Sequence, residues 1–202
     1  MQYGQMNLFS IPVYTGIDET FPSYKDQLID YIDDHKNTYD SQQVSNIKGY
    51  QSASNIHHDP KFETICRKLW GNAIQTGCDL LHRNFDANGF DNTTFSLLNI
   101  WFNINNPGSW NTQHTHPHCF YSGVLWVKAP KDSGDLIIHS PHAHDLYGIQ
   151  GNAWSIPPEE GRVVLFPSFL VHNVNTNSSQ RDRISISFNI LMDRNQPFAP
   201  HQ

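Results

Sequence analysis

The sequence predicts an α+β protein whose core is a jelly roll, or double-stranded β-helix, with N-terminal helices packed outside it. Two features of the chain lead to this prediction. Apolar residues recur at helical spacing in two segments before residue 90, whereas short alternating segments separated by Gly and Pro turns follow it. Two helices followed by many short strands are typical of an antiparallel sandwich or barrel that carries helices on its surface.

The chain is expected to form one domain. A length of 202 residues suits a single domain with a substantial core. Neither a break in composition nor an internal repeat marks a linker. The domain would span 1–202, with 1–90 as a helical support region and 91–202 as the jelly-roll core.

The N-terminal part is expected to hold one extended segment and two helices. Residues 7–14 have the pattern of an extended segment, and Pro12 suggests that it lies at a sheet edge. Helical spacing predicts a helix from 22 to about 36, followed by a long polar loop over 37–56 with one short ordered piece. A second helix is expected over 59–84, because it opens with an Asp-Pro pair that suits a helix start.

The C-terminal part is expected to hold the strands. The clearest alternation lies over 93–105, where Asn99, Trp101 and Asn103 share one face. Further strands are expected around His114 and at 121–128, 135–139, 153–156, 162–166, 171–174 and 183–191.

The last strand has one apolar and one polar face. Its polar face carries Arg183, Ser185, Ser187 and Asn189. In a jelly roll, such a face either lines a ligand cavity or lies against water, and the pattern alone does not choose between the two.

Composition excludes some classes of protein. A net charge of −6 with no basic run argues against a dedicated nucleic-acid binder. The longest apolar stretches have the length of strands, so no membrane span is expected, and residues 1–13 do not resemble a signal peptide. The widely spaced Cys66, Cys78 and Cys119 suggest neither disulfides nor a zinc knuckle, which favours a reducing, cytoplasmic setting.

A His-x-His pair is the strongest sign of chemistry. In a strand, His114 and His116 point to the same side and could bind one ion together. Neutral imidazole is a common ligand for Zn, Cu, Fe and Ni. A register in which His116 and His118 bind is an alternative, and the distant His172 is the expected third ligand.

Two spacings resemble the cupin signatures. The pattern Gly-x5-His-x-His over 108–116 resembles the first, and Gly-x5-Pro-x4-His over 161–172 resembles the second. This resemblance implies that both sets of histidines meet inside one barrel. The acidic residue of the first cupin motif is absent, and Phe169 stands where the second motif prefers Gly.

An Arg-x-Ser motif points to one branch of this fold. His172 is followed 11 residues later by Arg183-Ile-Ser185, which resembles the 2-oxoglutarate and Fe(II)-dependent oxygenases. The resemblance implies that Arg183 holds the distal carboxylate of 2-oxoglutarate and that Ser185 assists. The chemistry fits, because a guanidinium pairs bidentately with a carboxylate and keeps its charge. Arg181 is the alternative to Arg183.

Several short motifs follow one another in the order found in a 2-oxoglutarate/Fe(II) oxygenase family of marine bacteria and phages, which is distantly similar to prolyl 4-hydroxylases. They are Leu8-Phe-Ser-Ile-Pro12, Gly49-Tyr-Gln-Ser52, Trp101-Phe-Asn103, His114-Thr-His-Pro117, Ser122-Gly-Val124, Phe166-Pro-Ser168 and Arg183-Ile-Ser-Ile-Ser-Phe-Asn189. The resemblance implies Fe(II) and 2-oxoglutarate as cofactors, with Asn103 and Trp126 as further contacts to the co-substrate.

One residue departs from the oxygenase pattern. His116 occupies the place where these enzymes usually carry Asp or Glu. Either three neutral imidazoles, from His114, His116 and His172, hold the iron, or a carboxylate arrives from elsewhere. Three imidazoles would leave the site one unit more positive and favour an anionic co-substrate.

Other histidines and tryptophans admit two interpretations each. His139, His142 and His144 form a second cluster, which is either a second metal site or a solvated loop at the rim of the substrate site. The tryptophans either form an aromatic wall around a substrate or pack in the core. These are Trp101, Trp110, Trp126 and Trp154.

The expected function is an Fe(II)- and 2-oxoglutarate-dependent dioxygenase. It would use O2 to hydroxylate an unidentified substrate, a peptidyl side chain such as proline or a small molecule, and release succinate and CO2. The alternatives are a cupin-type three-His metalloenzyme without 2-oxoglutarate and a non-catalytic jelly-roll binding module. The aromatic content is compatible with a homodimer.

Overall fold

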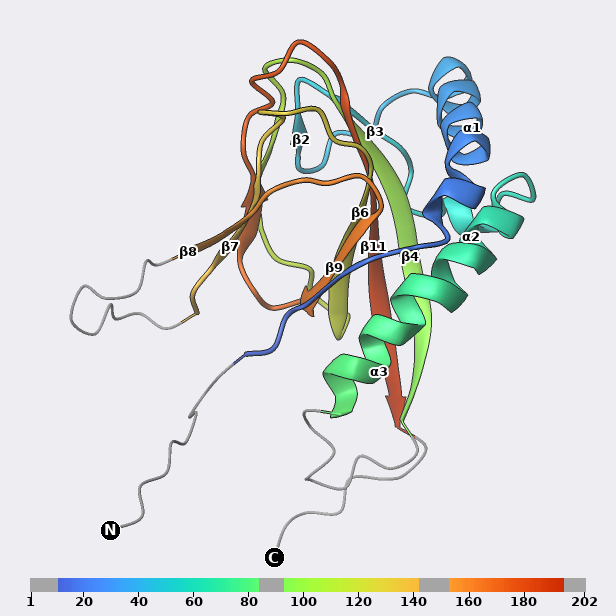
Figure 1. Cartoon of the computed structure of the whole chain (residues 1–202), viewed down its shortest axis with the longest axis vertical. Helices are drawn as coiled ribbons and strands as arrows, with labels where there is room; N and C mark the ends of the chain where they lie inside the picture. The colour runs from blue at the N-terminus through green and yellow to red at the C-terminus, as the bar shows by residue number, and fades with distance from the viewer. Residues whose placement is uncertain (1–10, 84–92, 142–152, 195–202) are drawn as a thin grey trace, which may run out of the picture.

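The computed structural model describes residues 11–83, 93–141 and 153–194 (Figure 1). Its helical elements are η1 (Phe21–Ser23), α1 (Lys25–Thr38), η2 (Ile56–His58), α2 (Glu63–Leu69), η3 (Trp70–Ile74) and α3 (Gln75–Arg83). Its strands before residue 90 are β1 (Tyr14–Ile17), β2 (Asn46–Ile47) and β3 (Tyr50–Gln51). The later strands are β4 (Thr93–Asn105), β5 (Trp110–His114), β6 (Tyr121–Lys128), β7 (Leu136–His139), β8 (Ala153–Ile156), β9 (Arg162–Pro167), β10 (His172–Val174) and β11 (Arg183–Arg194).

The strands form two sheets. One has the order β1-β9-β6-β11-β4-β3 and the other the order β2-β5-β10-β7-β8. Neighbouring strands in both sheets are antiparallel, and most neighbours are distant in sequence. The predicted antiparallel β core is therefore confirmed. Among the described residues, no helix combines the length and the apolar character needed to cross a bilayer.

Strands from before residue 90 enter both sheets. β1 pairs with β9 at one edge of the six-stranded sheet, and β3 pairs with β4 at its other edge. β2 pairs with β5 in the second sheet. The segment 37–56, expected as a long loop with one short ordered piece, contributes two short strands, whose partners are too distant in sequence for a local pattern to reveal.

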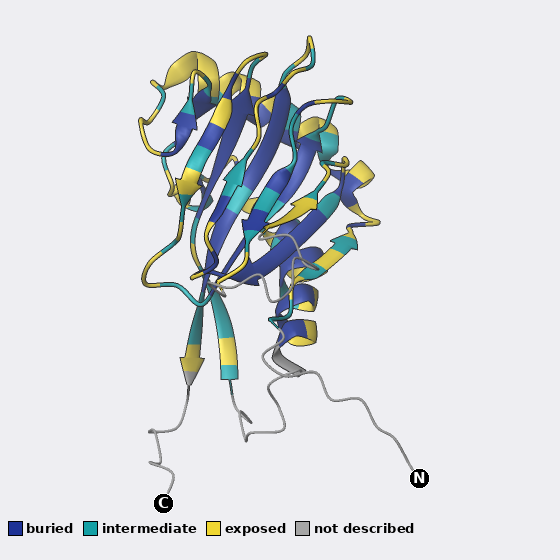
Figure 2. Cartoon of the chain, turned by 90° about the vertical axis from the view of Figure 1, so that its left-hand side faces the viewer, coloured by how far each residue is buried: buried dark blue, intermediate teal, exposed yellow. Residues whose placement is uncertain are grey.

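One apolar core joins the helices to the six-stranded sheet. Leu28 and Ile32 of α1 share a buried cluster with Ile186 and Phe188 of β11. Each large apolar side chain that is fully buried contributes about 1.5–3 kcal/mol to stability. Figure 1 shows α2 and α3 running alongside β4 and β11, and Figure 2 shows the buried strands between exposed loops.

The second helical segment is interrupted. The sequence predicts one helix over 59–84, whereas the structure has α2, a π-helical turn at Trp70–Ile74 and then α3. The helix also begins later than expected, because Asp59 accepts hydrogen bonds from the backbone N–H of Lys61 and Phe62 within a turn. A π-turn shifts the apolar positions by one residue, which a strict 3.6-residue period does not anticipate.

The polar face of β11 lies between the two sheets. Arg183, Ser185 and Asn189 are buried there, whereas the alternating isoleucines of β11 face the helices. Arg183, Ser185 and the partly buried Ser187 line a cavity. Of the two interpretations that the sequence left open, the structure therefore supports the face that lines a cavity.

Candidate metal and co-substrate site

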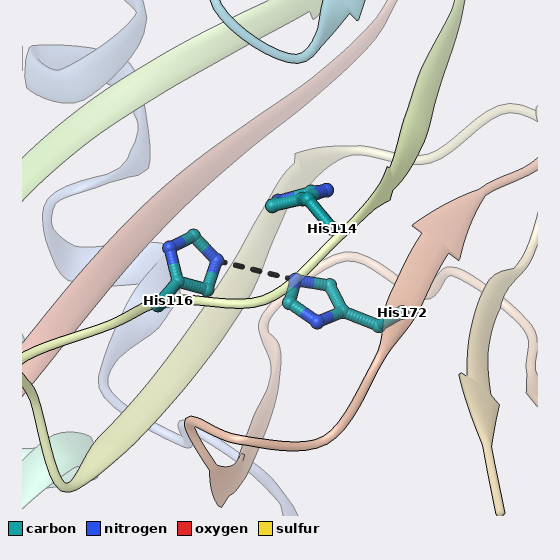
Figure 3. A group of neighbouring side chains, drawn as sticks. All are labelled: His114, His116 and His172. Atoms are coloured by element: carbon teal, nitrogen blue, oxygen red, sulfur yellow. Dashed lines mark hydrogen bonds between the residues drawn. The ribbon is translucent and has the colours of Figure 1, made fainter.

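Three histidines meet at one end of the five-stranded sheet. His114 ends β5, His116 follows it by two residues, and His172 begins β10, where it pairs directly with His114. Each offers a ring nitrogen, and these nitrogens lie within 4.8 Å of one another (Figure 3). The spacing that suggested a metal site in the sequence thus corresponds to a compact cluster.

Backbone carbonyls fix the tautomers of two of the rings. Nδ1 of His114 lies 2.6 Å from the carbonyl oxygen of Thr112. Nδ1 of His172 lies 2.9 Å from the carbonyl oxygen of Leu170. A carbonyl only accepts, so each Nδ1 carries the proton and each Nε2 keeps its lone pair for a metal.

His116 has a different environment. Its Nδ1 lies 3.5 Å from Nδ2 of Asn189, and its Nε2 lies 3.2 Å from Nε2 of His172. The Asn189 amide is itself held, because it donates to Asn99 and accepts from Ser122 at 2.8 and 2.7 Å. In this arrangement His116 accepts at Nδ1 and donates from Nε2 to His172. Binding a metal through Nε2 requires the His116 proton to move to Nδ1.

Burial favours the neutral form of all three rings. Loss of hydration, reinforced by the neighbouring His114, lowers the pKa of His116 to about 4 and that of His172 to about 3. Burial also lowers the pKa of His114. Only the neutral imidazole is a ligand, so the cluster is ready to bind a divalent metal at neutral pH. Among the described residues, no carboxylate belongs to this cluster.

Arg183 lies in the same cavity as the histidines. It is 1% exposed, and its Nη1 donates to the carbonyl oxygens of Ser133, Gly134 and Asn175. Its Nη2 is buried and has no hydrogen-bond partner among the described residues. Burial lowers the pKa of Arg183 to about 10, so the guanidinium remains charged at neutral pH. A buried charge with a free N–H group is a favourable anchor for a carboxylate.

A glycine makes room for this guanidinium. Gly134 has φ +93°, and an added Cβ would lie 2.8 Å from Nη1 of Arg183 and 2.2 Å from the carbonyl oxygen of Asn175. The turn therefore needs both the left-handed backbone and the missing side chain of glycine.

The other predicted co-substrate contacts form one row across the six-stranded sheet. Ser185 of β11 is paired with Asn103 of β4 on one side and with Trp126 of β6 on the other. All three line the cavity that holds Arg183 and the histidines. The amide of Asn103 is already engaged, since it accepts from Asn46 at 3.2 Å and donates to Ser187 at 3.3 Å.

The remaining candidates lie elsewhere. His118 is outside the cluster, in a turn with φ +65°. Nε2 of His139 lies 2.7 Å from Oδ1 of Asn173, so this ring already has a partner. His142 and His144 lie outside the described residues.

Sequence reasoning missed the residues that support His116. Asn189 was placed on the polar face of its strand, but nothing in the sequence connected it to His116, Asn99 or Ser122. These contacts arise from pairing between β11, β4 and β6. The one sequence feature that pointed towards these contacts was the polar face that Asn189 shares with Arg183, Ser185 and Ser187.

A family model described as "Putative 2OG-Fe(II) oxygenase" matches residues 99–189, the range that contains the three histidines and Arg183. Residues 99–189, a little under half of the chain, are thus similar to this oxygenase family. No curated protein matches the chain in sequence.

Solved structures share the fold of this oxygenase region at low identity. A prolyl-4-hydroxylase from Pseudomonas putida is 14% identical with a TM-score of 0.57, and the match covers 90% of this chain and 93% of the hydroxylase. The non-heme alpha-ketoglutarate-dependent epimerase SnoN from nogalamycin biosynthesis is 10% identical with a TM-score of 0.66. The match covers 90% of this chain and 76% of the epimerase. HygX from Streptomyces hygroscopicus, with nickel, 2-oxoglutarate and hygromycin B bound, is 8% identical with a TM-score of 0.61. The match covers 89% of this chain and 82% of HygX.

Proposed function

We propose that the chain is an Fe(II)- and 2-oxoglutarate-dependent dioxygenase that uses O2 to hydroxylate a substrate and releases succinate and CO2. The observation that carries this proposal is the buried Nη2 of Arg183, which has no hydrogen-bond partner in the described part of the chain and lies in the cavity lined by the three histidines. A metal site and a carboxylate anchor in one enclosed space suit a co-substrate that has a chelating end and a carboxylate end.

The three histidines would hold the iron. His114 and His172 present Nε2 with the proton fixed on Nδ1, and His116 completes the set once its own proton lies on Nδ1. Bound iron supplies the activation of O2 that is coupled to decarboxylation of 2-oxoglutarate. Three protein ligands leave positions on an octahedral ion for the co-substrate and for O2.

The far end of the cavity would hold the co-substrate. Arg183 donates from Nη2 to the distal carboxylate, and the Ser185 hydroxyl lies two residues further along the same face of β11. Trp126 and Asn103 line this path, and the Asn103 amide is held in place by Asn46 and Ser187. The buried surroundings exclude water and strengthen the Arg183–carboxylate pair.

The solved structures support the chemistry class and leave the substrate open. One is a prolyl-4-hydroxylase, one is an epimerase, and one holds 2-oxoglutarate with nickel and hygromycin B. Hydroxylation is proposed from similarity to the first. The substrate is either a peptidyl side chain such as proline or a small molecule.

We infer that the proposed enzyme is one domain over 1–202, with its N-terminal helices on the outer face of the six-stranded sheet. Two observations support this organisation: strands from before residue 90 pair into both sheets, and one core cluster joins helix and strand residues.

Anaerobic titration with Fe(II) and 2-oxoglutarate tests the proposal. Chelation of iron by the co-substrate is expected to give a visible charge-transfer band. Arg183→Ala should weaken 2-oxoglutarate binding at least tenfold, whereas Arg181→Ala, on an exposed side chain nearby, should bind it like the wild type. Equal binding by both variants would contradict the role of Arg183.

A second candidate function is a three-His metalloenzyme that does not use 2-oxoglutarate. The donor set favours it, because no carboxylate joins the cluster in the part of the chain that the structure describes. Iron binding without a charge-transfer band on addition of 2-oxoglutarate would support this function over the first.

A further inference from the structure

A row of side chains extends from the histidines to the far edge of the five-stranded sheet. His172 pairs directly with His114 on one side and with Ile138 of β7 on the other, and Ile138 pairs with Trp154 of β8. Residues directly opposite in antiparallel strands share a face, so all four side chains lie on the same side of the sheet. Two strand spacings put the Trp154 backbone about 10 Å from that of His172.

A groove of about 520 Å³ begins where this row ends. Ile138 and Trp154 line it on the side of β7 and β8, and Ile11 and Val13, next to β1, line it on the other. Figure 1 shows β7 and β8 on the side of the molecule away from the helices. Trp154 is 76% exposed, so this tryptophan does not pack in the core as Trp126 does.

The groove has the properties of a small-molecule site. Its volume falls within the range of about 300–1,000 Å³ that is usual for such sites, which are mostly apolar with a few polar groups. Pairing with an extended peptide is disfavoured, because β8 has only 4 residues and Pro157 and Pro158, which follow it, have no N–H to donate.

One polar group in the groove has no hydrogen-bond partner within 11–83, 93–141 and 153–194. Arg162 lines it, and its Nε is buried without a hydrogen-bond partner among the described residues. The guanidinium is otherwise held by Glu159 and Thr15. An acceptor on a ligand could bind this N–H group next to the apolar residues of the groove, whose lining also includes the polar Thr15, His139 and Ser155.

We propose that this groove binds the substrate of the reaction, and that the substrate is a small molecule with a flat apolar ring system. The ring system stacks on Trp154, an acceptor group meets Nε of Arg162, and the reacting carbon lies on the side of the groove lined by Ile138, the residue paired with His172. The position of the reacting carbon rests on the proposed function, whereas binding in the groove does not.

Binding of 8-anilinonaphthalene-1-sulfonate, which carries a flat ring system and an acceptor, tests the groove. The probe is expected to bind the full chain, with at least tenfold loss in Trp154→Ala and near wild-type binding in Trp154→Phe. The matched control is Trp110→Ala, at an exposed tryptophan of β5 outside the groove, which should bind like the wild type. No binding by the wild type, or equal losses in Trp154→Ala and Trp110→Ala, would overturn the proposal.

The position of the groove relative to the histidines is tested with Mn(II). Mn(II) bound to the wild type should enhance the relaxation of the probe's ring protons several-fold, and diamagnetic Zn(II) should not. Bound Mn(II) without enhancement would overturn the link between groove and histidines. Titration with Mn(II) alone, followed by electron paramagnetic resonance, separates this result from failure of the metal site itself.

Discussion

Nδ2 of Asn189 lies 3.5 Å from Nδ1 of His116, on the side of the ring opposite to the other two histidines. The Asn189 amide therefore determines which ring nitrogen of His116 carries the proton. As an amide nitrogen it donates, which keeps the His116 proton on Nε2. Metal binding therefore favours the reversed amide, with oxygen towards His116, and the Asn99 and Ser122 partners must reorient with it.

Two substitutions of Asn189 are expected to change metal affinity in opposite directions. Asn189→Asp supplies an acceptor for the His116 Nδ1 proton and should tighten Co(II) binding about tenfold, within the range known for groups that orient ligands. Asn189→Leu removes the acceptor and should weaken binding about tenfold. Isothermal titration calorimetry with Co(II) measures both.

A matched control distinguishes the contact with His116 from the effect of the added negative charge. Asn173→Asp adds the same negative charge next to His172 in β10, in an environment where Asn173 contacts His139. It should alter Co(II) affinity much less than Asn189→Asp. Equal effects of the two substitutions would mean that long-range charge, and not the contact with His116, is responsible.

The third imidazole should influence co-substrate affinity. His116→Asp puts a carboxylate, itself a good ligand for Fe(II), in place of the third imidazole, so iron is expected to remain bound. The added negative charge lowers the net charge of the loaded site by one unit, which should weaken 2-oxoglutarate binding several-fold. Anaerobic titration of the charge-transfer band gives the affinity. His116→Ala should lose metal binding, and unchanged metal binding in that variant would remove His116 from the ligand set.

Stability of the metal-free chain should depend on pH through the buried histidines. Burial lowers the pKa of His172 from 6.5 in the unfolded chain to about 3 in the folded one. The unfolded chain therefore binds more protons between these values, and the free energy of unfolding falls as pH drops below about 6.5. Urea denaturation of wild type and His172→Gln between pH 7.5 and 5 measures this. Parallel profiles for the two proteins would contradict the prediction.

Gly134 should be sensitive to substitution in both stability and co-substrate binding. Gly134→Ala adds left-handed strain and places Cβ against Asn175 and Arg183, so destabilisation of about 2–5 kcal/mol is expected. Gly108 also has positive φ, +83°, but no atom lies within 4 Å of an added Cβ. Gly108→Ala should therefore cost only about 1–2 kcal/mol and leave 2-oxoglutarate affinity unchanged. Chemical denaturation and the co-substrate titration distinguish the two variants.

The sequence predicts local features well and contacts between distant strands poorly. Alternation identified the strand faces of β4 and β11 and the shared side of His114 and His116, because both follow from backbone geometry. His172 was linked to this pair through the resemblance to the cupin signatures. The contact of Asn189 with His116 and the row from His172 to Trp154 depend on which strands become neighbours. No local period carries that information, so both were found only in the structure.

The helical region shows the same limit. Helical spacing located α1 to within a few residues, but the π-helical turn at Trp70–Ile74 was not anticipated. The strands β2 and β3 lie in the segment expected as a long loop with one short ordered piece. The sequence did not identify them as strands, because two-residue strands form through partners in β5 and β4 and not through their own propensity.

The shared polar face of β11 has a consequence for the length of the acids that the cavity accepts. Arg183 and Asn189 stand six residues apart on one extended strand, which separates them by about 20 Å. Because β11 is paired on both sides, this separation cannot adjust to the ligand. A five-carbon 2-oxo diacid and its four- and six-carbon homologues should therefore bind this cavity with unequal affinity. The fixed spacing along β11, and not rearrangement of side chains, determines which length fits best.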